Sequence, residues 1–128
     1  MFDIPVVQTA IAIKRGKPAA AIEALKPALQ YDNAPNETPF FRGLAYYSMK
    51  SGKEAAAEYT KAKAALRRTW VFDQLISVNQ LYLARALAMA GDTAGARREY
   101  QDLLAFWKDA DPDMPLLVQA KAEYAKIQ

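Results

Sequence analysis

The chain repeats a pattern of small, large and turn-forming residues with a spacing of 34 positions. The residue pairs related by this spacing include Pro5 with Pro39, Ala21 with Ala55, Leu25 with Tyr59 and Ala28 with Ala62. A spacing of about 34 residues is typical of helical repeat arrays, in which each unit is a helix, a turn and a second helix. The pattern therefore predicts helix pairs stacked on one another.

The apolar composition also favours helices over strands. Hydrophobic residues make up 52% of the 128 residues, alanine dominates among them, and glycine occurs only 5 times. Alanine is the strongest helix former, and the β-branched residues that strands prefer are scarce. A chain of this length can bury one core but is too short for two ordinary domains. We therefore predict a single all-α domain over residues 1–128.

Turn and capping residues divide the chain into three helix pairs and a terminal helix. Gly16, Gly52 and Gly91 each lie between the two helices of a pair, where glycine commonly ends a helix. The predicted pairs span residues 2–35, 36–69 and 77–110, and a capping helix follows over residues 114–127. The spacing between the second and third pairs is about seven residues longer than the period, which predicts an insertion or a helix extension there.

The second and third pairs share an order of small and large side chains at the expected helix crossings. The order is carried by Gly43, Tyr46, Ala55, Tyr59 and Ala62, and again by Ala84, Leu87, Ala96 and Tyr100. Small residues allow two helices to cross closely, and large residues fill the adjoining gaps. In these positions the chain resembles tetratricopeptide repeats.

The resemblance implies a short right-handed superhelical array of about seven helices. The first copy fits less well, because Thr9 and Ala12 stand in place of the small residue and the large aromatic. A weak match is expected at the end of an array. The last predicted helix resembles the solvating helix that commonly closes such arrays.

A narrower resemblance covers residues 91–100 and 106–113. These stretches are similar to the C-terminal repeat region of large bacterial proteins that carry a Ser/Thr kinase or a winged-helix DNA-binding domain upstream. The resemblance implies that the chain is one end of a larger regulatory protein. The sequence itself has no Gly-rich phosphate loop, no catalytic His-Arg-Asp and no Asp-Phe-Gly.

In tetratricopeptide arrays the first helices of successive pairs line a concave groove that holds a peptide or a partner helix. The resemblance carries this role to Val6, Ile13, Phe41, Leu44, Tyr47, Tyr82, Arg85 and Met89. Aromatic residues and arginine dominate the binding energy of many interfaces, so we expect a protein or peptide partner here. The alternative is that Phe41, Leu44 and Tyr47 fill the small core or meet a second copy of the chain.

Recognition of an acidic chaperone C-terminus is not expected. Arrays with that function use lysine and asparagine in the groove as a carboxylate clamp, whereas the matching positions here are apolar. They hold Val6, Ala10, Phe40, Leu44 and Leu81. Arg85 is then the one groove cation predicted to contact a peptide carboxylate.

Composition argues against an enzyme and against several other classes. The chain has no Cys and no His, which removes disulfides, the usual metal ligands and the usual general base. The net charge of +3 comes from 17 basic and 14 acidic residues that are interspersed, so nucleic-acid binding is not expected. No membrane-spanning run or export signal is visible, and we expect a cytoplasmic protein.

Two smaller features have simple structural explanations. Asp109, Asp111 and Asp113 alternate as in a calcium loop, but Met114 and Ala120 stand where that loop needs glycine and a bidentate glutamate. We therefore predict no metal and no cofactor. Trp70 and Phe72 are expected to cover the seam between the second and third pairs, the alternative being that they stand exposed as a partner contact. Trp107 is expected to pack under the last helix near Tyr124.

The sequence thus predicts a non-catalytic module that binds a peptide or partner domain in the groove. The alternative is an oligomerisation or spacer element, with the apolar groove buried against a second copy in a homodimer or against a neighbouring domain.

Overall fold

The computed structural model describes residues 14–17, 19, 22–23, 38–66, 73–110 and 112–127. These residues form helices and turns and no strand, so the described part of the chain is all-helical, as predicted. The helices are α3 (Thr38–Ser48), α4 (Gly52–Leu66), α5 (Asp73–Met89), α6 (Thr93–Phe106) and α7 (Pro115–Ile127). None of the helices in these described ranges is long and apolar enough to cross a membrane.

The first predicted helix pair lies almost entirely outside the described residues. Two groove residues, Val6 and Ile13, and the seam aromatics Trp70 and Phe72 also lie outside them. The predictions made for these four residues therefore have no structural counterpart.

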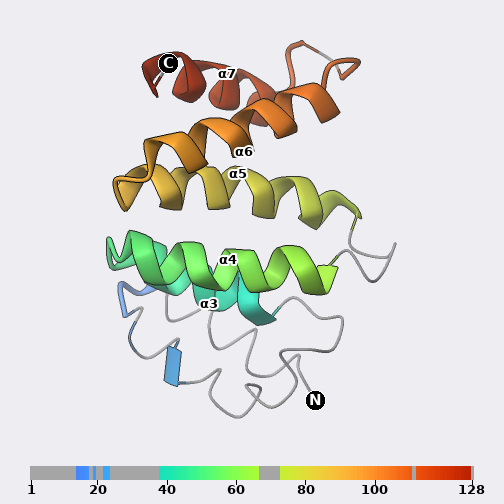
Figure 1. The fold of residues 1–128 in the computed structure, drawn as a ribbon. Coiled ribbons are helices and arrows are strands. Elements are labelled where there is room, and N and C mark those ends of the chain that lie inside the picture. The colour runs from blue at the N-terminus through green and yellow to red at the C-terminus, as the bar shows by residue number, and fades with distance from the viewer. Residues whose placement is uncertain are drawn as a thin grey trace.

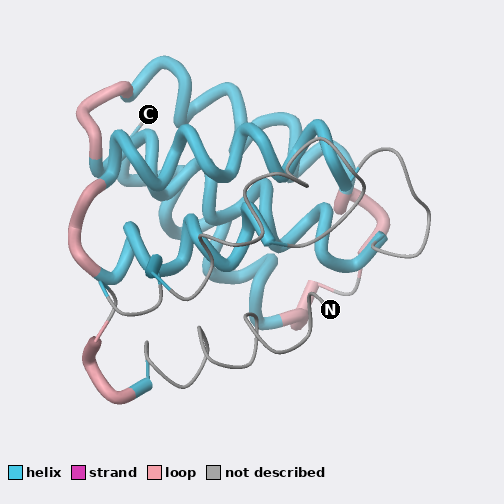
Figure 2. The backbone as a smooth tube through the Cα atoms, turned by 90° about the horizontal axis from the view of Figure 1, so that it is seen from below, coloured by secondary structure: helices cyan, strands magenta, loops and turns pink. Residues whose placement is uncertain are grey.

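The five helices form a stack in which each helix packs on the next in sequence (Figure 1). The turns at residues 49–51 and 90–92 lie at one edge of the stack, and the α6–α7 connection lies at the opposite edge. Figure 2 shows the same helices from below, where they overlie one another. The second and third predicted pairs are thus α3 with α4 and α5 with α6, and α7 is the predicted terminal helix.

The two described pairs span residues 38–66 and 73–106, each end lying two to four residues from its predicted bound, and one difference at the second turn is informative. The sequence places the break between α3 and α4 at Ser51 and Gly52, but the chain turns at Lys50, whose φ is 62°. Ser51 N donates to Tyr46 O at 2.9 Å and Lys50 N donates to Tyr47 O at 3.0 Å, the paired bonds that close a helix with a left-handed residue. Gly52 is instead the first residue of α4.

Gly52 lies where the start of α4 packs against the end of α5. A Cβ atom added at Gly52 would lie 2.8 Å from Ala90 N and 2.9 Å from Ala86 O. Only glycine lets the start of α4 approach the end of α5 this closely. At the next turn Gly91 does take the left-handed conformation, with φ 90°, and Asp92 caps α6 by accepting from Gly95 N at 2.9 Å.

Two core clusters share α5. The first joins α3, α4 and α5 through seven buried residues: Phe40, Ala55, Ala56, Tyr59, Ala62, Leu83 and Ala86. The second joins α5, α6 and α7 through six: Leu81, Ala84, Ala96, Tyr100, Leu103 and Ala120. Trp107 and Tyr124 both pack against the second cluster. Helix α5 therefore holds the two ends of the stack together.

Helices α3 and α4 cross closely where Gly43 meets Tyr59. Tyr59 is 0% exposed, and a Cβ atom added at Gly43 would lie 2.6 Å from Tyr59 Cε1 and 2.8 Å from Cδ1. Real Cβ atoms do not approach a ring this closely, so the crossing depends on the missing side chain. The small and large residues predicted to meet at this crossing do meet there.

Candidate protein-interaction surface

The predicted groove residues in the described part of the chain come from α3 and α5. Phe41, Leu44 and Tyr47 lie on α3 and Tyr82 lies on α5, and all four are partly buried and pack against the first cluster. Arg85 is also partly buried, whereas Met89 at the end of α5 is 37% exposed. The structure therefore places the apolar members partly in the core and leaves the end of α5 open to solvent.

Tyr47, Tyr82 and Arg85 form a continuous row of contacts across α3 and α5. The rings of Tyr47 and Tyr82 meet edge to face with centroids 5.6 Å apart, and the Arg85 guanidinium carbon lies 5.1 Å from the Tyr82 centroid. Such aromatic and cation–π contacts each contribute on the order of 1 kcal/mol. We call these three residues the tyrosine–arginine row.

Tyr82 anchors the row to the core. Its ring centroid lies 5.9 Å from that of Phe40 and 5.9 Å from that of the fully buried Tyr59. With three aromatic neighbours the Tyr82 ring has little freedom to turn, so the face it presents to Arg85 is fixed.

Arg85 has a carboxylate partner within the chain, which the sequence did not predict. Its Nε donates to Glu123 Oε1 at 2.8 Å, and its Nη2 donates to Glu123 Oε2 at 2.7 Å and to Gln119 Oε1 at 2.9 Å. Tyr100 Oη donates to Glu123 Oε1 at 2.7 Å. A two-point contact between arginine and a carboxylate is the strongest ion-pair geometry available to side chains, so Arg85 fastens α7 onto α5.

The pKa values in this group follow from its burial and charges. Burial alone would raise the pKa of Glu123, but hydrogen bonds from Arg85 and Tyr100 and the positive charges of Arg85 and Lys126 together lower it below 4.5. The hydrogen bond to Glu123 raises the pKa of Arg85. Burial raises the pKa of Tyr47, against the opposing charge of Arg85. Glu123 and Arg85 are therefore both ionised at neutral pH.

The Arg85–Glu123 pair changes how a ligand carboxylate could bind. A peptide carboxylate that approached Arg85 would have to compete with a carboxylate already held at two points. The groups left for a ligand on this face are the outward edges of Tyr47 and Tyr82 and the exposed Met89. Stacking and apolar contact are the chemistry that these side chains offer.

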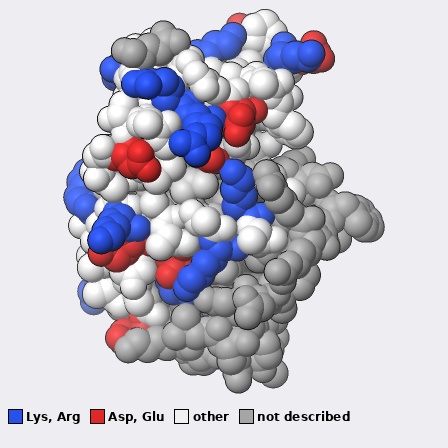
Figure 3. All heavy atoms as spheres, viewed as in Figure 1, with Lys and Arg blue, Asp and Glu red and all other residues white. Residues whose placement is uncertain are grey.

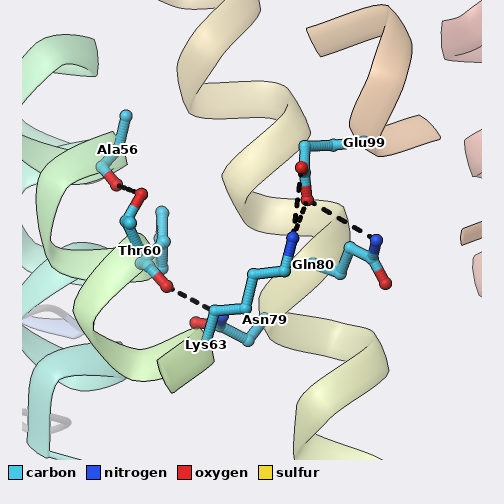
Figure 4. Close-up of polar contacts among 7 residues, drawn as sticks. Ala56, Thr60, Lys63, Asn79, Gln80 and Glu99 are labelled. Carbon is cyan, nitrogen blue, oxygen red and sulfur yellow. Dashed lines mark hydrogen bonds and ion pairs between the residues drawn. The ribbon is translucent and has the colours of Figure 1, made fainter. Parts of the chain in front are cut away.

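A second polar network lies between α4, α5 and α6. Lys63 Nζ donates to Glu99 Oε1 at 2.9 Å and to Oε2 at 3.2 Å, and Asn79 Nδ2 donates to the Tyr59 carbonyl at 3.0 Å (Figure 4).

Side-chain contacts join alternate helices of the stack. Tyr47 on α3 contacts Tyr82 on α5, and Arg85 on α5 contacts Glu123 on α7. Lys63 on α4 contacts Glu99 on α6 in the same way. The odd-numbered and even-numbered helices form two layers, and we call the first the α3–α5–α7 face.

The sequence has a cluster of four cations at Lys61, Lys63, Arg67 and Arg68, and the two that the structure describes both have acidic partners. Lys63 is bound to Glu99, and Lys61 Nζ lies 3.7 Å from Glu58 Oε2. Figure 3 shows basic and acidic side chains interleaved across the visible face. Arg67 and Arg68, the other members of this cluster, lie outside the described residues.

Glu58 also takes part in an inner ion pair within the α3–α4 pair. Arg42 Nε donates to Glu58 Oε1 at 2.8 Å, and the two side chains are 3% and 12% exposed. The pair fixes the register of α3 on α4 and is held too deeply to take part in binding. In the described ranges no three Asp or Glu residues come together as a metal site would require.

Comparison with protein-family models, with curated proteins and with solved structures found no match to the chain. The resemblance to tetratricopeptide repeats therefore stays a prediction from the sequence.

The residues that sequence reasoning missed are Glu123, Gln119 and Tyr100 in their contacts around Arg85. Arg85 and Glu123 are 38 positions apart and belong to different predicted units. A signal was nonetheless present, because Glu123 is the only acidic residue of α7 and Arg85 the only charged residue of α5 after Asp73.

Proposed function

We propose that the protein is a non-catalytic module that binds a peptide or a partner domain on the α3–α5–α7 face. In this proposal the helix pairs form a tetratricopeptide-like array of three repeats and a closing helix, and the chain acts as part of a larger bacterial regulatory protein. The tight crossings at Gly43 and Tyr59 and the buried Ala84, Ala96 and Tyr100 support the repeat arrangement.

The tyrosine–arginine row carries the proposal. It combines two rigid, partly exposed tyrosines with a cation on one ring and ends one turn before the exposed Met89. Aromatic side chains held in place by their neighbours bind partners at a low entropy cost, and methionine adapts to irregular apolar surfaces. Together these groups suit a ligand that offers aromatic or aliphatic side chains.

The low pKa and the hydrogen bonds of Glu123 support a non-catalytic role for this carboxylate. A general acid or base works best when its pKa lies near the operating pH, but Arg85 and Tyr100 keep the pKa of Glu123 low and its oxygens occupied. The carboxylate thus serves to attach α7 rather than to move protons.

A pull-down from lysate of the source cell tests the proposal. The wild-type protein is compared with Tyr47→Ala and Met89→Glu, and with Phe106→Ser as a control at a residue that is 71% exposed on α6. A partner retained by wild type and by Phe106→Ser but lost by both other variants is expected. Equal retention by all four folded proteins would contradict binding at this face. Arg85 is left unchanged because its loss would remove its hydrogen bonds to Glu123 and Gln119 on α7.

A structural spacer or oligomerisation element is the second candidate. It is favoured by the packing of Phe41, Leu44, Tyr47 and Tyr82 against the first cluster, which gives these side chains a role without any ligand. Light scattering separates the two proposals, because a self-associating protein would show a mass that rises with concentration and falls in Met89→Glu.

A further inference from the structure

Helix α7 has an apolar face on each of its two sides. The inner side buries Leu117 and Ala120 and packs Leu116, Tyr124 and Ile127 against the second cluster. The outer side exposes Pro115, Val118, Ala122 and Ala125, and Val118 alone is 51% exposed. At about 100° per residue these four lie within an arc of about 80°, opposite the buried residues. We call them the outer stripe.

Two lysines border the outer stripe. Lys121 lies on one side, Lys126 lies with Gln119 on the other, and both lysines are exposed. The one carboxylate of α7, Glu123, is turned away and held by Arg85. The outer surface of α7 thus offers apolar side chains between positive charges, without a negative charge of its own.

This surface differs from the one that the sequence implied for the last helix. A helix that closes an array is expected to present polar residues to solvent. The outer stripe instead resembles the inner surfaces of the stack, where alanines such as Ala84 and Ala96 allow neighbouring helices to approach closely. Helices α4, α5 and α6 each pack on both preceding and following helices, whereas α7 packs on the rest of the described stack from one side only.

We propose that the outer stripe of α7 is a docking site for an amphipathic helix of a protein partner that carries Asp or Glu beside its apolar stripe. The small side chains of Ala122 and Ala125 allow close helix contact, and Val118 supplies the largest apolar contact. The acidic flanks follow from charge complementarity with Lys121 and Lys126. The four residues of the outer stripe are turned by about 80–160° around α7 from Glu123, and none of them belongs to the tyrosine–arginine row. The proposal therefore does not rest on the function proposed above.

Two other occupants fit the surface less well. A second copy paired through α7 would set lysines against lysines. A membrane surface is bound by amphipathic helices with large apolar residues such as Trp, Phe and Leu, whereas the outer stripe has only proline, valine and alanine.

A designed peptide tests the proposal on the full chain. The probe is a fluorescein-labelled helical peptide with alternating Leu and Ala along one stripe and Glu on both flanks. The wild-type protein is expected to bind it saturably, and Val118→Glu to bind it at least about tenfold more weakly. Lys121→Glu with Lys126→Glu should lose the Glu-flanked peptide and gain a Lys-flanked version, which a merely apolar surface would not do. Phe106→Ser is the control.

Every outcome of this experiment bears on the proposal. Absence of saturable binding at about 1 mM protein, or equal binding by wild type and a folded Val118→Glu, would overturn it. Concentration-dependent dimerisation of wild type that Val118→Glu abolishes would assign the stripe to a second copy. Binding of phosphatidylserine vesicles that Val118→Glu abolishes would assign it to a membrane surface. Circular dichroism and melting curves confirm that each variant is folded, and because Val118 is exposed its replacement should leave the fold intact.

Discussion

Replacing Gly43 with alanine adds one methyl group at the close crossing of α3 and α4. The new Cβ would lie 2.6 Å from Tyr59 Cε1, 2.8 Å from Cδ1 and 3.0 Å from Cζ. Three ring atoms are approached at once, and the ring cannot move away because Tyr59 is fully buried between Phe40 and Tyr82. The two helices must therefore separate, or the ring must leave its position.

Two opposing effects determine how much Gly43→Ala changes the free energy of unfolding. Overpacking a well-packed core costs about 1–3 kcal/mol. Alanine in a helix interior is favoured over glycine by about 1 kcal/mol, which offsets part of that cost. We expect Gly43→Ala to lower the free energy of unfolding by about 1 kcal/mol, which for a chain of this size lowers Tm by about 4 °C.

Urea denaturation followed by circular dichroism measures the change. Ala57→Gly, at an exposed position of α4, reports the helix-propensity difference in this protein without any packing effect. In a Tyr59→Leu background the ring atoms are absent, so Gly43→Ala should become neutral or stabilising. A Gly43→Ala protein that is more stable than wild type by the full helix-propensity difference measured at position 57 would show no steric cost and would refute the close crossing of α3 and α4.

Three further predictions concern other residues. Lys50→Gly should raise the free energy of unfolding by up to about 1 kcal/mol in the same assay, because glycine takes the left-handed conformation without strain. Glu58→Ala should lower the free energy of unfolding, since it removes the carboxylate that lies 2.8 Å from the buried Arg42 Nε, and Arg42→Met in the same chain should recover part of that loss. The folded state lowers the pKa of Glu123, so its ionised form stabilises the fold above about pH 4.5, and the stability difference between wild type and Glu123→Gln should shrink as the pH falls below that value.

The helix pairs of the described region could be predicted because their signals are local. Glycine residues mark the turns, and Asp92 caps α6 directly after Gly91. Gly43, Ala55 and Tyr59 revealed the crossing because a small and a large residue recur at fixed places in each pair.

The contacts that sequence reasoning missed depend on how distant segments meet. The break after α3 was misplaced because Gly52, the stronger turn signal, is required for contact with α5, which leaves Lys50 in the strained position. The Arg85–Glu123 pair joins helices 38 positions apart, beyond the reach of any local pattern. The outer stripe of α7 was overlooked because alanine contributes little to an apolar pattern, although two alanines and Val118 suffice to form a face.

Photo-crosslinking inside the source cell tests the central claim most directly. A benzophenone amino acid is placed at Met89, beside the tyrosine–arginine row, and in a parallel strain at Phe106, which is more exposed but lies on α6. We expect a discrete crosslinked partner from position 89 that disappears in a Tyr47→Ala background, and none of the same mass from position 106. The same partner captured from both positions, or capture at position 89 unaffected by Tyr47→Ala, would contradict binding at the α3–α5–α7 face.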